Sequence, residues 1–359
     1  MRSSVLLPAT LVAFVLVENA IFNSGRYARI VKLDSSAGNV EQILWNEKSR
    51  ARDHRPQVVA VGDSRMGFFV RYADQTKPAL EEQFATIAVP GSTPRDWYYL
   101  LRDIDPRANR YAAILIPMDD YDDAETLENR ADRETDLHYL IAVLHWRDLF
   151  EFPESYQSRE LKFRAALGIL LKGTVYKADF QDLLLNVPER LRLADLARNY
   201  SAQWFYNYVG SSDSLAGTKV DWAKKTVTVP PGVSPDKEAM VRSRLFDPRP
   251  PDEHRASEYL HHWLGKIEQR YRGSRTRLIF FRLPRGPFVR PDPPPFNAHS
   301  SVRDLAKNAN VIVENEDDFD FLERPEFFLE ALHMNAAGCA EFSRALAAHV
   351  QELLDAHAL

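Results

Sequence analysis

The chain has 359 residues and a mass of 41.2 kDa, which fits either one α/β domain with insertions or two domains. Hydrophobic residues make up 45% and charged residues 27%, which excludes a disordered, collagenous or multispanning membrane chain. The formal net charge of -5 argues against a general nucleic-acid binder, and the single cysteine, Cys339, excludes a disulfide framework and a cysteine-rich zinc site. A packed core must therefore supply the stability, and no nucleic-acid partner is expected.

The first predicted element is an apolar segment at the N-terminus. Residues 5–22 read VLLPATLVAFVLVENAIF, which is borderline in length for a membrane span. Glu18 and Asn19 shorten the strictly apolar part to that of a signal peptide, but they leave no small-x-small cleavage site. We predict that residues 1–22 are an uncleaved membrane anchor, with a cleaved signal and a buried helix as alternatives. Residues 23–55 then form a polar connector.

Short apolar runs alternate with helical segments after the connector. Strands separated by helices are joined by crossover connections, so this pattern predicts a parallel sheet built from βαβ units. In chain order we expect a strand at 57–61, a helix at 65–72, a strand at 85–89, a helix at 93–104 and a strand at 111–116.

A long, mostly helical stretch then interrupts the sheet at about 122–274, and we interpret it as an insertion. The sheet is expected to resume afterwards. The elements are a strand at 277–283, a proline-rich loop at 284–300, a short strand at 311–314 and a terminal helix at 336–356. Residues 56–359 are thus predicted to form one α/β domain with a helical insertion.

A serine stands at the first strand-to-helix turn. Ser64, in the sequence GDSRMG, follows the first strand directly, where helix amides can stabilise an oxyanion. In an open parallel sheet the crevice lies at the carboxyl ends of the strands, where Gly91 and Asp119 also emerge. The spacing differs from the G-x-S-x-G elbow of α/β-hydrolases. Ser64 is a candidate nucleophile, with an ordinary helix cap as the structural alternative.

A serine nucleophile needs a base, and His333 lies just before the terminal helix in the sequence EALHMNAAG. In acyl transfer the imidazole takes the hydroxyl proton, and a carboxylate orients the imidazole. Glu330 precedes His333 by three residues, so one short segment can supply both side chains. A structural histidine is the alternative, because the chain has ten histidines.

The blocks AVGDS, ending at Ser64, and LHMNAAG, containing His333, resemble the first and last sequence blocks of the SGNH (GDSL-type) hydrolase superfamily. The resemblance implies a three-layer α/β/α, flavodoxin-like fold with a parallel sheet, and no cofactor. It implies that Ser64 is the nucleophile and that the amides of Ser64 and Gly91 form an oxyanion hole. His333 would be the general base. Glu330 stands where the family usually has aspartate, and it would orient the imidazole.

The third block departs from the family pattern. Where the family reads G-x-N-D with an asparagine that donates to the oxyanion, this chain reads PMDD, which puts Asp119 at that position. An ionised carboxylate accepts hydrogen bonds and would repel an oxyanion unless it is protonated or turned away. Asp119 is therefore a doubtful member of the oxyanion hole. Alternative carboxylates for His333 occur in an acidic run that comprises Glu316, Asp317, Asp318 and Asp320.

Three arginines near the expected strand ends, Arg65, Arg282 and Arg285, are weak candidates for contacting an anionic or sugar substrate, with solvated side chains as the alternative. No metal is predicted, because His261 and His262 lack the H-E-x-x-H spacing.

The layout of an apolar N-terminus, a connector and an SGNH core looks like membrane-anchored members that modify envelope polymers, such as alginate-type O-acetylation proteins and the D-alanyl transfer protein of teichoic-acid systems. This resemblance implies an extracytoplasmic domain, in the periplasm or at the cell surface, acting on acylated carbohydrate beside polysaccharide-assembly proteins. We predict a serine-dependent esterase or O-acyltransferase. The alternatives are a catalytically weak SGNH-like polysaccharide-binding or assembly protein, and a lipase or phospholipase.

Overall fold

The computed structural model describes residues 3–33, 35–50, 57–69, 83–123, 130–199, 211–247, 253–289, 291 and 298–356. Its contacts divide the chain into two compact units. Unit 1 comprises Met1–Arg52, Arg95–Ile104 and Asn129–Phe205, and unit 2 comprises Asp53–Pro94, Asp105–Glu128 and Tyr206–Leu359. The first part of the predicted insertion therefore groups with the N-terminal segment, and the remainder belongs to the unit that carries the sheet.

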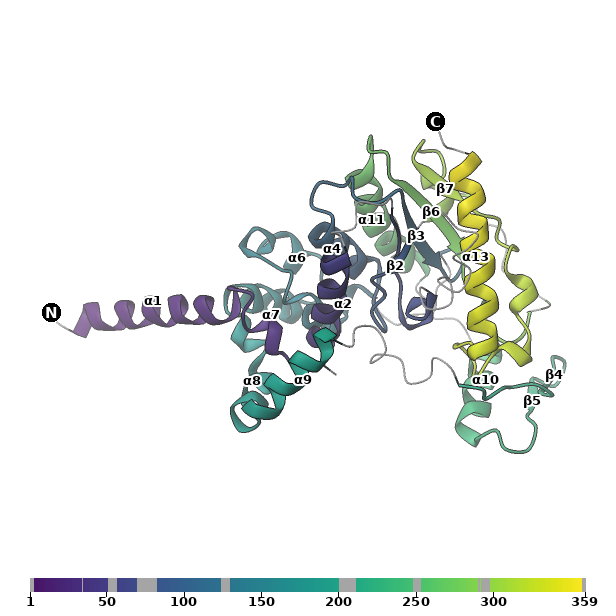
Figure 1. The fold of residues 1–359 in the computed structure, drawn as a ribbon, viewed down its shortest axis with the longest axis horizontal. Coiled ribbons are helices and arrows are strands. Elements are labelled where there is room, and N and C mark those ends of the chain that lie inside the picture. The colour runs from purple at the N-terminus through teal and green to yellow at the C-terminus, as the bar shows by residue number, and fades with distance from the viewer. Residues whose placement is uncertain are drawn as a thin grey trace. The chain divides into compact units, whose positions relative to one another are not determined.

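Unit 2 is built on a parallel sheet of five strands in the order β2-β1-β3-β6-β7 (Figure 1). The α/β class and the parallel sheet expected from the sequence are confirmed. The strands are β1 (Gln57–Ala60), β2 (Gln83–Thr86), β3 (Ala113–Met118), β6 (Arg277–Arg282) and β7 (Val311–Val313).

The central strands β3 and β6 are buried on both faces, in keeping with the apolar sequence AILIPM of β3 and the apolar centre LIFF of β6. One face packs against α13 (Ala336–Ala356), whose Phe342 and Leu346 share a core cluster with Leu115 and Phe281. On the other side Figure 1 shows α11 (Glu253–Tyr271), which buries an apolar stripe at helical spacing. The stripe consists of Leu260, Trp263, Leu264 and Ile267.

Strand β3 continues through Pro117, although the sequence predicted its end at residue 116. Backbone bonds alternate sides along a strand: the Leu115 carbonyl accepts from Val61 beside β1, and the Met118 carbonyl accepts from Leu283 beside β6. The Pro117 nitrogen therefore faces the β1 side, where the ladder with β1 has already ended at Leu115. The missing N–H removes no sheet hydrogen bond, which is why proline is tolerated in a central strand.

Two other boundaries differ from the predictions. The expected helix at 65–72 begins as a 3₁₀ turn, η2 (Ser64–Met66), and the chain becomes α-helical at Phe69; the predicted residues after 69 lie outside the described part of the chain. The second strand was predicted at 85–89, whereas β2 ends at Thr86. The amides of Ile87 and Val89 still donate to carbonyls at the end of β1, so the chain follows the sheet edge as far as the turn at Gly91.

The remaining described elements of unit 2 lie between the sheet strands, or after them, along the chain. They are the antiparallel hairpin β4 (Lys219–Asp221) and β5 (Thr226–Thr228), the helices α10 (Pro235–Phe246) and α12 (Ser301–Leu305), and the 3₁₀ turns η7 (Asp320–Leu322) and η8 (Pro325–Phe327). The hairpin was not expected within a helical insertion. Between β6 and α12, the described residues form no helix or strand, as the prolines predicted.

Unit 1 is helical. Its elements are α1 (Ser3–Phe22), η1 (Ala28–Ile30), α2 (Ser36–Arg50), α4 (Pro94–Ile104, in unit 1 from Arg95), η4 (Arg130–Asp132), α5 (Glu134–Leu140), η5 (Trp146–Asp148), α6 (Glu151–Glu154), α7 (Arg159–Leu170), η6 (Lys172–Thr174), α8 (Lys177–Leu185) and α9 (Val187–Asn199). The predicted connector thus contains a helix, α2. Within the described part of the chain, no helix is both long and apolar enough to cross a bilayer.

Candidate active site

The turn that presents Ser64 depends on a glycine. Gly62 has φ +143°, and a Cβ at this position would lie 2.6 Å from the Cγ of Met66. The Gly62 carbonyl accepts bonds from the Val89 amide at 3.0 Å and the Ser92 hydroxyl at 2.7 Å. These bonds fix the turn after β1 beside the turn after β2. Ser64 then begins η2, and its side chain is partly accessible.

The histidine block is held in a tight loop. Phe328 and Met334 form an antiparallel bridge, and the Leu329 amide donates to the His333 carbonyl at 3.0 Å. Asn335, two residues after His333, caps α13 because its Oδ1 accepts from the amide of Gly338 at 3.0 Å. A Cβ at Gly338 would lie 2.3 Å from the Phe327 carbonyl oxygen, so only glycine fits there. The sequence LHMNAAG therefore encodes a capped helix start with His333 just outside it.

The structure brings Ser64, His333 and Glu330 into one hydrogen-bonded chain. Ser64 Oγ lies 2.8 Å from His333 Nε2, and His333 Nδ1 lies 2.7 Å from Glu330 Oε1. The His333 side chain is 23% exposed and that of Glu330 is 8% exposed. A carboxylate on Nδ1 fixes the proton on that nitrogen, which leaves Nε2 free to accept the Ser64 hydroxyl proton. This arrangement can activate a serine for attack on an acyl group.

Glu330 is held as an anion. Its Oε1 accepts from the Leu332 amide at 3.1 Å and from both the amide and the Nδ1 of His333. Burial raises the pKa of Glu330, but the bonds and charge of His333 and the Leu332 amide outweigh burial, so the net pKa is lowered. An ionised carboxylate can stabilise the imidazolium that forms when His333 takes a proton.

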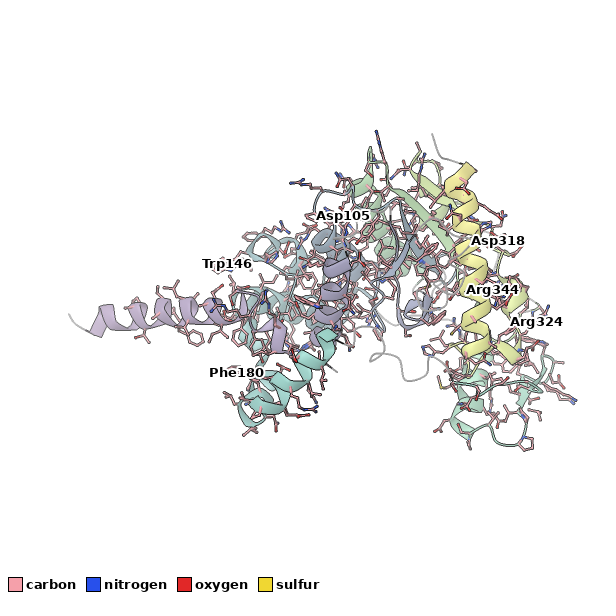
Figure 2. The ribbon with its side chains drawn as sticks, in the orientation of Figure 1. Asp105, Trp146, Phe180, Asp318, Arg324 and Arg344 are labelled. Atoms are coloured by element: carbon pink, nitrogen blue, oxygen red, sulfur yellow. The ribbon has the colours of Figure 1, made fainter. Side chains whose placement is uncertain are left out.

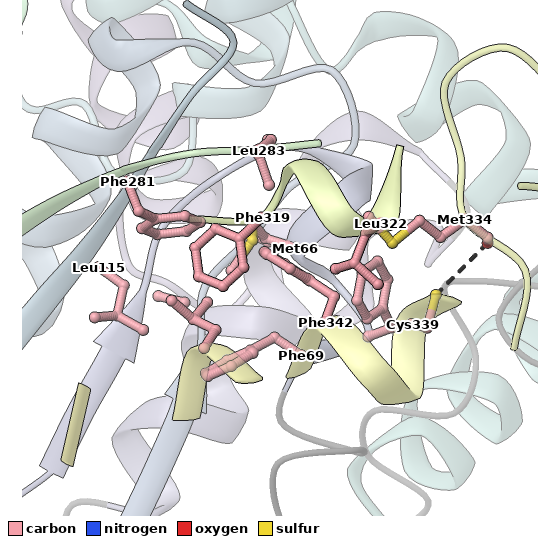
Figure 3. Packing of buried hydrophobic residues seen from close by; sticks show 14 of the residues in the cluster. Met66, Phe69, Leu115, Phe281, Leu283, Phe319, Leu322, Met334, Cys339 and Phe342 are labelled. Carbon is pink, nitrogen blue, oxygen red and sulfur yellow. Dashed lines mark hydrogen bonds between the residues drawn. The ribbon is translucent and has the colours of Figure 1, made fainter. Parts of the chain in front are cut away.

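Packing fixes the two halves of the site against each other. Met66, two residues after Ser64, and Met334, next to His333, belong to the same buried cluster as Phe342 and Cys339 of α13 (Figure 3). The Cys339 thiol also donates to the Met334 carbonyl at 3.5 Å. Burial raises the pKa of this thiol, so Cys339 is an inert core residue. The nucleophile and the base are therefore anchored through their neighbours in one core.

Asp119 forms an ion pair with the residue that follows the serine. Its Oδ1 pairs with Nη1 of Arg65, and the Arg65 Nη2 lies 2.7 Å from Asp63 Oδ2. Burial lowers the pKa of Arg65, but the charges of Asp119 and Asp63 raise it more, so the guanidinium stays protonated. The Arg65 guanidinium thus neutralises the Asp119 carboxylate, whose negative charge made Asp119 a doubtful member of the oxyanion hole. Sequence reasoning did not pair Arg65 with Asp119, although both were expected at strand ends of one crevice.

Gly91 lies in the exposed turn that follows β2, with φ +70°. The Val89 bond to Gly62 places this turn next to the one that carries Ser64. The position matches the expected one, and the contribution of the Gly91 amide to an oxyanion hole stays a prediction.

Arg282 and Arg285 both pair with carboxylates that follow β6 in the chain, and the substrate contact considered for them stays a prediction. Arg282 is buried, and its guanidinium pairs with Asp320 and with Glu323 Oε1, the latter at 2.9 Å. Arg285 binds the same Glu323 oxygen at 2.9 Å through Nε. These carboxylates already engage both side chains, so we assign the two arginines to holding the loop after β6.

Three of the four alternative carboxylates of the acidic run have partners of their own. Glu316 pairs with Arg303, Asp318 accepts from the Asn315 amide at 3.1 Å, and Asp320 pairs with Arg282. Glu330 is therefore the carboxylate that the structure places on His333.

Comparison with known proteins adds no relative. No protein-family model matches the chain, and no curated protein matches its sequence.

Proposed function

We propose that this protein is a serine-dependent esterase or O-acyltransferase of the SGNH type. The observation that carries the proposal is the chain of bonds from Ser64 Oγ to His333 Nε2 and from His333 Nδ1 to Glu330, at 2.8 Å and 2.7 Å. These distances lie within the hydrogen-bond reach that a nucleophile, a general base and an orienting carboxylate require.

The reaction follows from the direction of these bonds. Ser64 Oγ attacks the carbonyl carbon of an ester while its proton passes to His333 Nε2, and the carbonyl oxygen becomes an oxyanion. The intermediate collapses to an acyl-serine, and the leaving alkoxide takes the proton from His333. A water or a sugar hydroxyl then gives its proton to His333 and attacks the acyl carbon. As the bond between the acyl carbon and Ser64 Oγ breaks, His333 returns this proton to Ser64 Oγ, which restores the free enzyme. Hydrolysis and transfer differ only in this second nucleophile.

The oxyanion would be held by backbone amides. We assign this role to the amides of Ser64 and Gly91, which lie in adjacent turns. Because Asp119 is paired with Arg65, its carboxylate carries little uncompensated charge toward the developing anion. An aspartate at position 119, where the family has asparagine, is thus compatible with catalysis. This favours an enzyme over a catalytically weak binding protein.

The topology supports the SGNH assignment. The sheet order is β2-β1-β3-β6-β7. If its five strands are renumbered one to five along the chain, this order becomes 2-1-3-4-5, which is the doubly wound order of flavodoxin-like folds. Ser64 follows β1 and Asp119 follows β3, so the site lies where the strand order reverses. Ligands of open parallel sheets bind at this switch point.

The substrate and location complete the proposal. We infer an acyl ester of exported or cell-envelope carbohydrate as the substrate, from the resemblance described above. We propose that helix α1 attaches the protein to a membrane; it does not reach the length and apolarity of a membrane-spanning helix, but several of its apolar side chains between residues 11 and 17 are largely exposed. They are Leu11, Val12, Phe14, Leu16 and Val17. Lipid would cover such a surface, and alkaline extraction of cell membranes is the test: a retained protein supports the anchor, and a released one contradicts it.

The activity is tested with a fluorophosphonate, which labels activated serines without requiring knowledge of the substrate. The full chain should be labelled, and Ser64→Ala and His333→Ala should each abolish labelling. Ser301→Ala is a matched control. The Ser301 hydroxyl also lies 2.8 Å from a histidine nitrogen, but it is fully buried and donates to Asp123 Oδ2. Labelling should therefore be unchanged in this variant.

Hydrolysis of an aryl acetate by the same proteins separates the remaining functions. Turnover lost together with labelling supports the acyl-serine mechanism. A folded wild-type chain that neither reacts with the probe nor hydrolyses the ester would contradict it and favour the binding-protein alternative.

A further inference from the structure

Three potential metal ligands converge in unit 2, outside the proposed active site. Glu314 directly follows β7, Asp318 lies in the next turn, and His349 projects from α13. Each offers a ligand atom, and these atoms all lie within 4.8 Å of one another. His349 Nε2 pairs with Glu314 Oε2 and lies 3.8 Å from Asp318 Oδ2, which places Asp318 beside α13 (Figure 2).

A second observation points to a missing cation. The Glu314 side chain is only 5% exposed, and among the described residues no hydrogen-bond donor reaches its buried Oε1. A buried carboxylate oxygen without a donor carries a desolvation cost that a bound cation would offset. Burial raises the pKa of Glu314, and the charge of Asp318 raises it further, against the effect of His349. Two carboxylates and one imidazole therefore meet here.

We propose that Glu314, Asp318 and His349 form a binding site for a divalent first-row cation, either Zn²⁺ or Mn²⁺. One ion with bonds of about 2.0–2.2 Å to its ligands would hold the three ligand atoms slightly closer together than the 4.8 Å within which they lie here. One nitrogen and two carboxylate oxygens suit these ions better than Ca²⁺ or Cu⁺, because imidazole favours transition metals and carboxylates favour harder cations. Two anions balance the ion's charge.

The surroundings would orient the ligands. The backbone and side-chain amides of Asn315 donate to Asp318 at 3.1 Å and 3.4 Å. The Glu314 amide donates to the Phe280 carbonyl, which fixes the residue to the end of the sheet. An ion here would join the last strand to the middle of α13. Because α13 begins directly after the His333 block, the ion would stabilise the helix on which that block rests.

The test is calorimetric titration of the full chain with Zn²⁺, and separately with Mn²⁺, after dialysis against a chelator. We expect one ion bound per chain by at least one of the two metals. His349→Ala and Glu314→Gln should each weaken binding by about tenfold or more, because each removes one of three protein ligands. Asp318→Asn is a third variant. Asp318 is more exposed than Glu314, so this variant keeps the test informative if Glu314→Gln misfolds. Circular dichroism checks that each variant is folded.

His261→Ala is the matched control. His261 also faces two carboxylates, but Asp123 lies near its Nδ1 at 3.7 Å and Asp304 near its Nε2 at 3.5 Å, so the three groups do not converge on one point. Its loss should leave the affinity unchanged. Binding that persists in all three site variants, or no binding of either metal to the folded wild-type chain, would overturn the proposal and leave a plain His349–Glu314 ion pair. Neither outcome depends on labelling of Ser64.

Discussion

Replacement of Glu330 by glutamine tests the proposed relay most directly. The substitution keeps the size of the side chain and an oxygen that can accept the backbone amides of Leu332 and His333. It removes the negative charge opposite His333 Nδ1, which lies 2.7 Å from Glu330 Oε1. The amide group of glutamine can also turn its NH₂ toward the ring, which would favour the tautomer that cannot accept the Ser64 proton.

The size of the effect follows from the bond that is lost. A hydrogen bond to a charged group contributes about 1.5–3 kcal/mol, and each 1.4 kcal/mol corresponds to tenfold in rate, so the loss of charge alone should slow the reaction roughly 10- to 150-fold. The wrong tautomer would increase the loss toward about 10⁴-fold. The bond strengthens when His333 becomes positive in the transition state, so the loss should appear in kcat.

The assay is the second-order rate of fluorophosphonate labelling, measured beside aryl acetate hydrolysis. Glu316→Gln serves as the matched control, because Glu316 belongs to the acidic run that the sequence offered as an alternative and pairs with Arg303. We expect this control to react at the wild-type rate. Labelling of a folded Glu330→Gln variant at the wild-type rate would refute the assignment of Glu330 as the orienting group.

Three further predictions concern stability. Gly62→Ala should lower the free energy of unfolding by about 2 kcal/mol or more, because it combines a strained φ with a clash against Met66; an unchanged urea midpoint would contradict this. Arg65→Met should cost about 3–5 kcal/mol, since it breaks a nearly buried pair with Asp119. In a double-mutant cycle with Asp119→Leu, the loss in the double variant should be smaller than the sum of the two single losses by about 1–3 kcal/mol, and additive losses would argue against the pair. The lowered pKa of Glu330 predicts a stabilising contribution that is full above its ordinary value of 4.5 and disappears as the pH falls through the lower value in the folded protein. The difference in unfolding free energy between the wild type and Glu330→Gln should therefore shrink on acidification, and a difference that stays constant down to about pH 3 would count against the shift.

The sequence carried the local signals of the site well. Strand, glycine turn and serine are adjacent in the chain, and Glu330, His333 and Asn335 share one short loop, so their relation depends on local geometry. The parallel sheet was also predictable, because β3 and β6 are continuous apolar runs. The end of β3 was missed because proline normally marks a boundary. Its tolerance here depends on how far the neighbouring strand β1 extends, and that is set by the tertiary structure.

Long-range pairings were beyond sequence reasoning. The Arg65–Asp119 pair joins the turn after β1 to the end of β3, and the pairing of Arg282 with Glu323 joins β6 to the residues after η7. Charge alone suggested solvated or substrate-binding roles for these arginines. The grouping of residues 129–205 with the N-terminal helices is likewise a long-range property, since nothing local in these residues indicates it.

The wide separation of the site's two halves along the chain has a consequence for biosynthesis. Ser64 and His333 are 269 positions apart, and α13, whose buried face completes the core beneath them, is the last helix of the described chain. A ribosome-bound chain would therefore carry its nucleophile long before the base and the core that positions it exist. The serine should stay unreactive toward acyl donors until the His333 segment and α13 have been made and packed against the sheet.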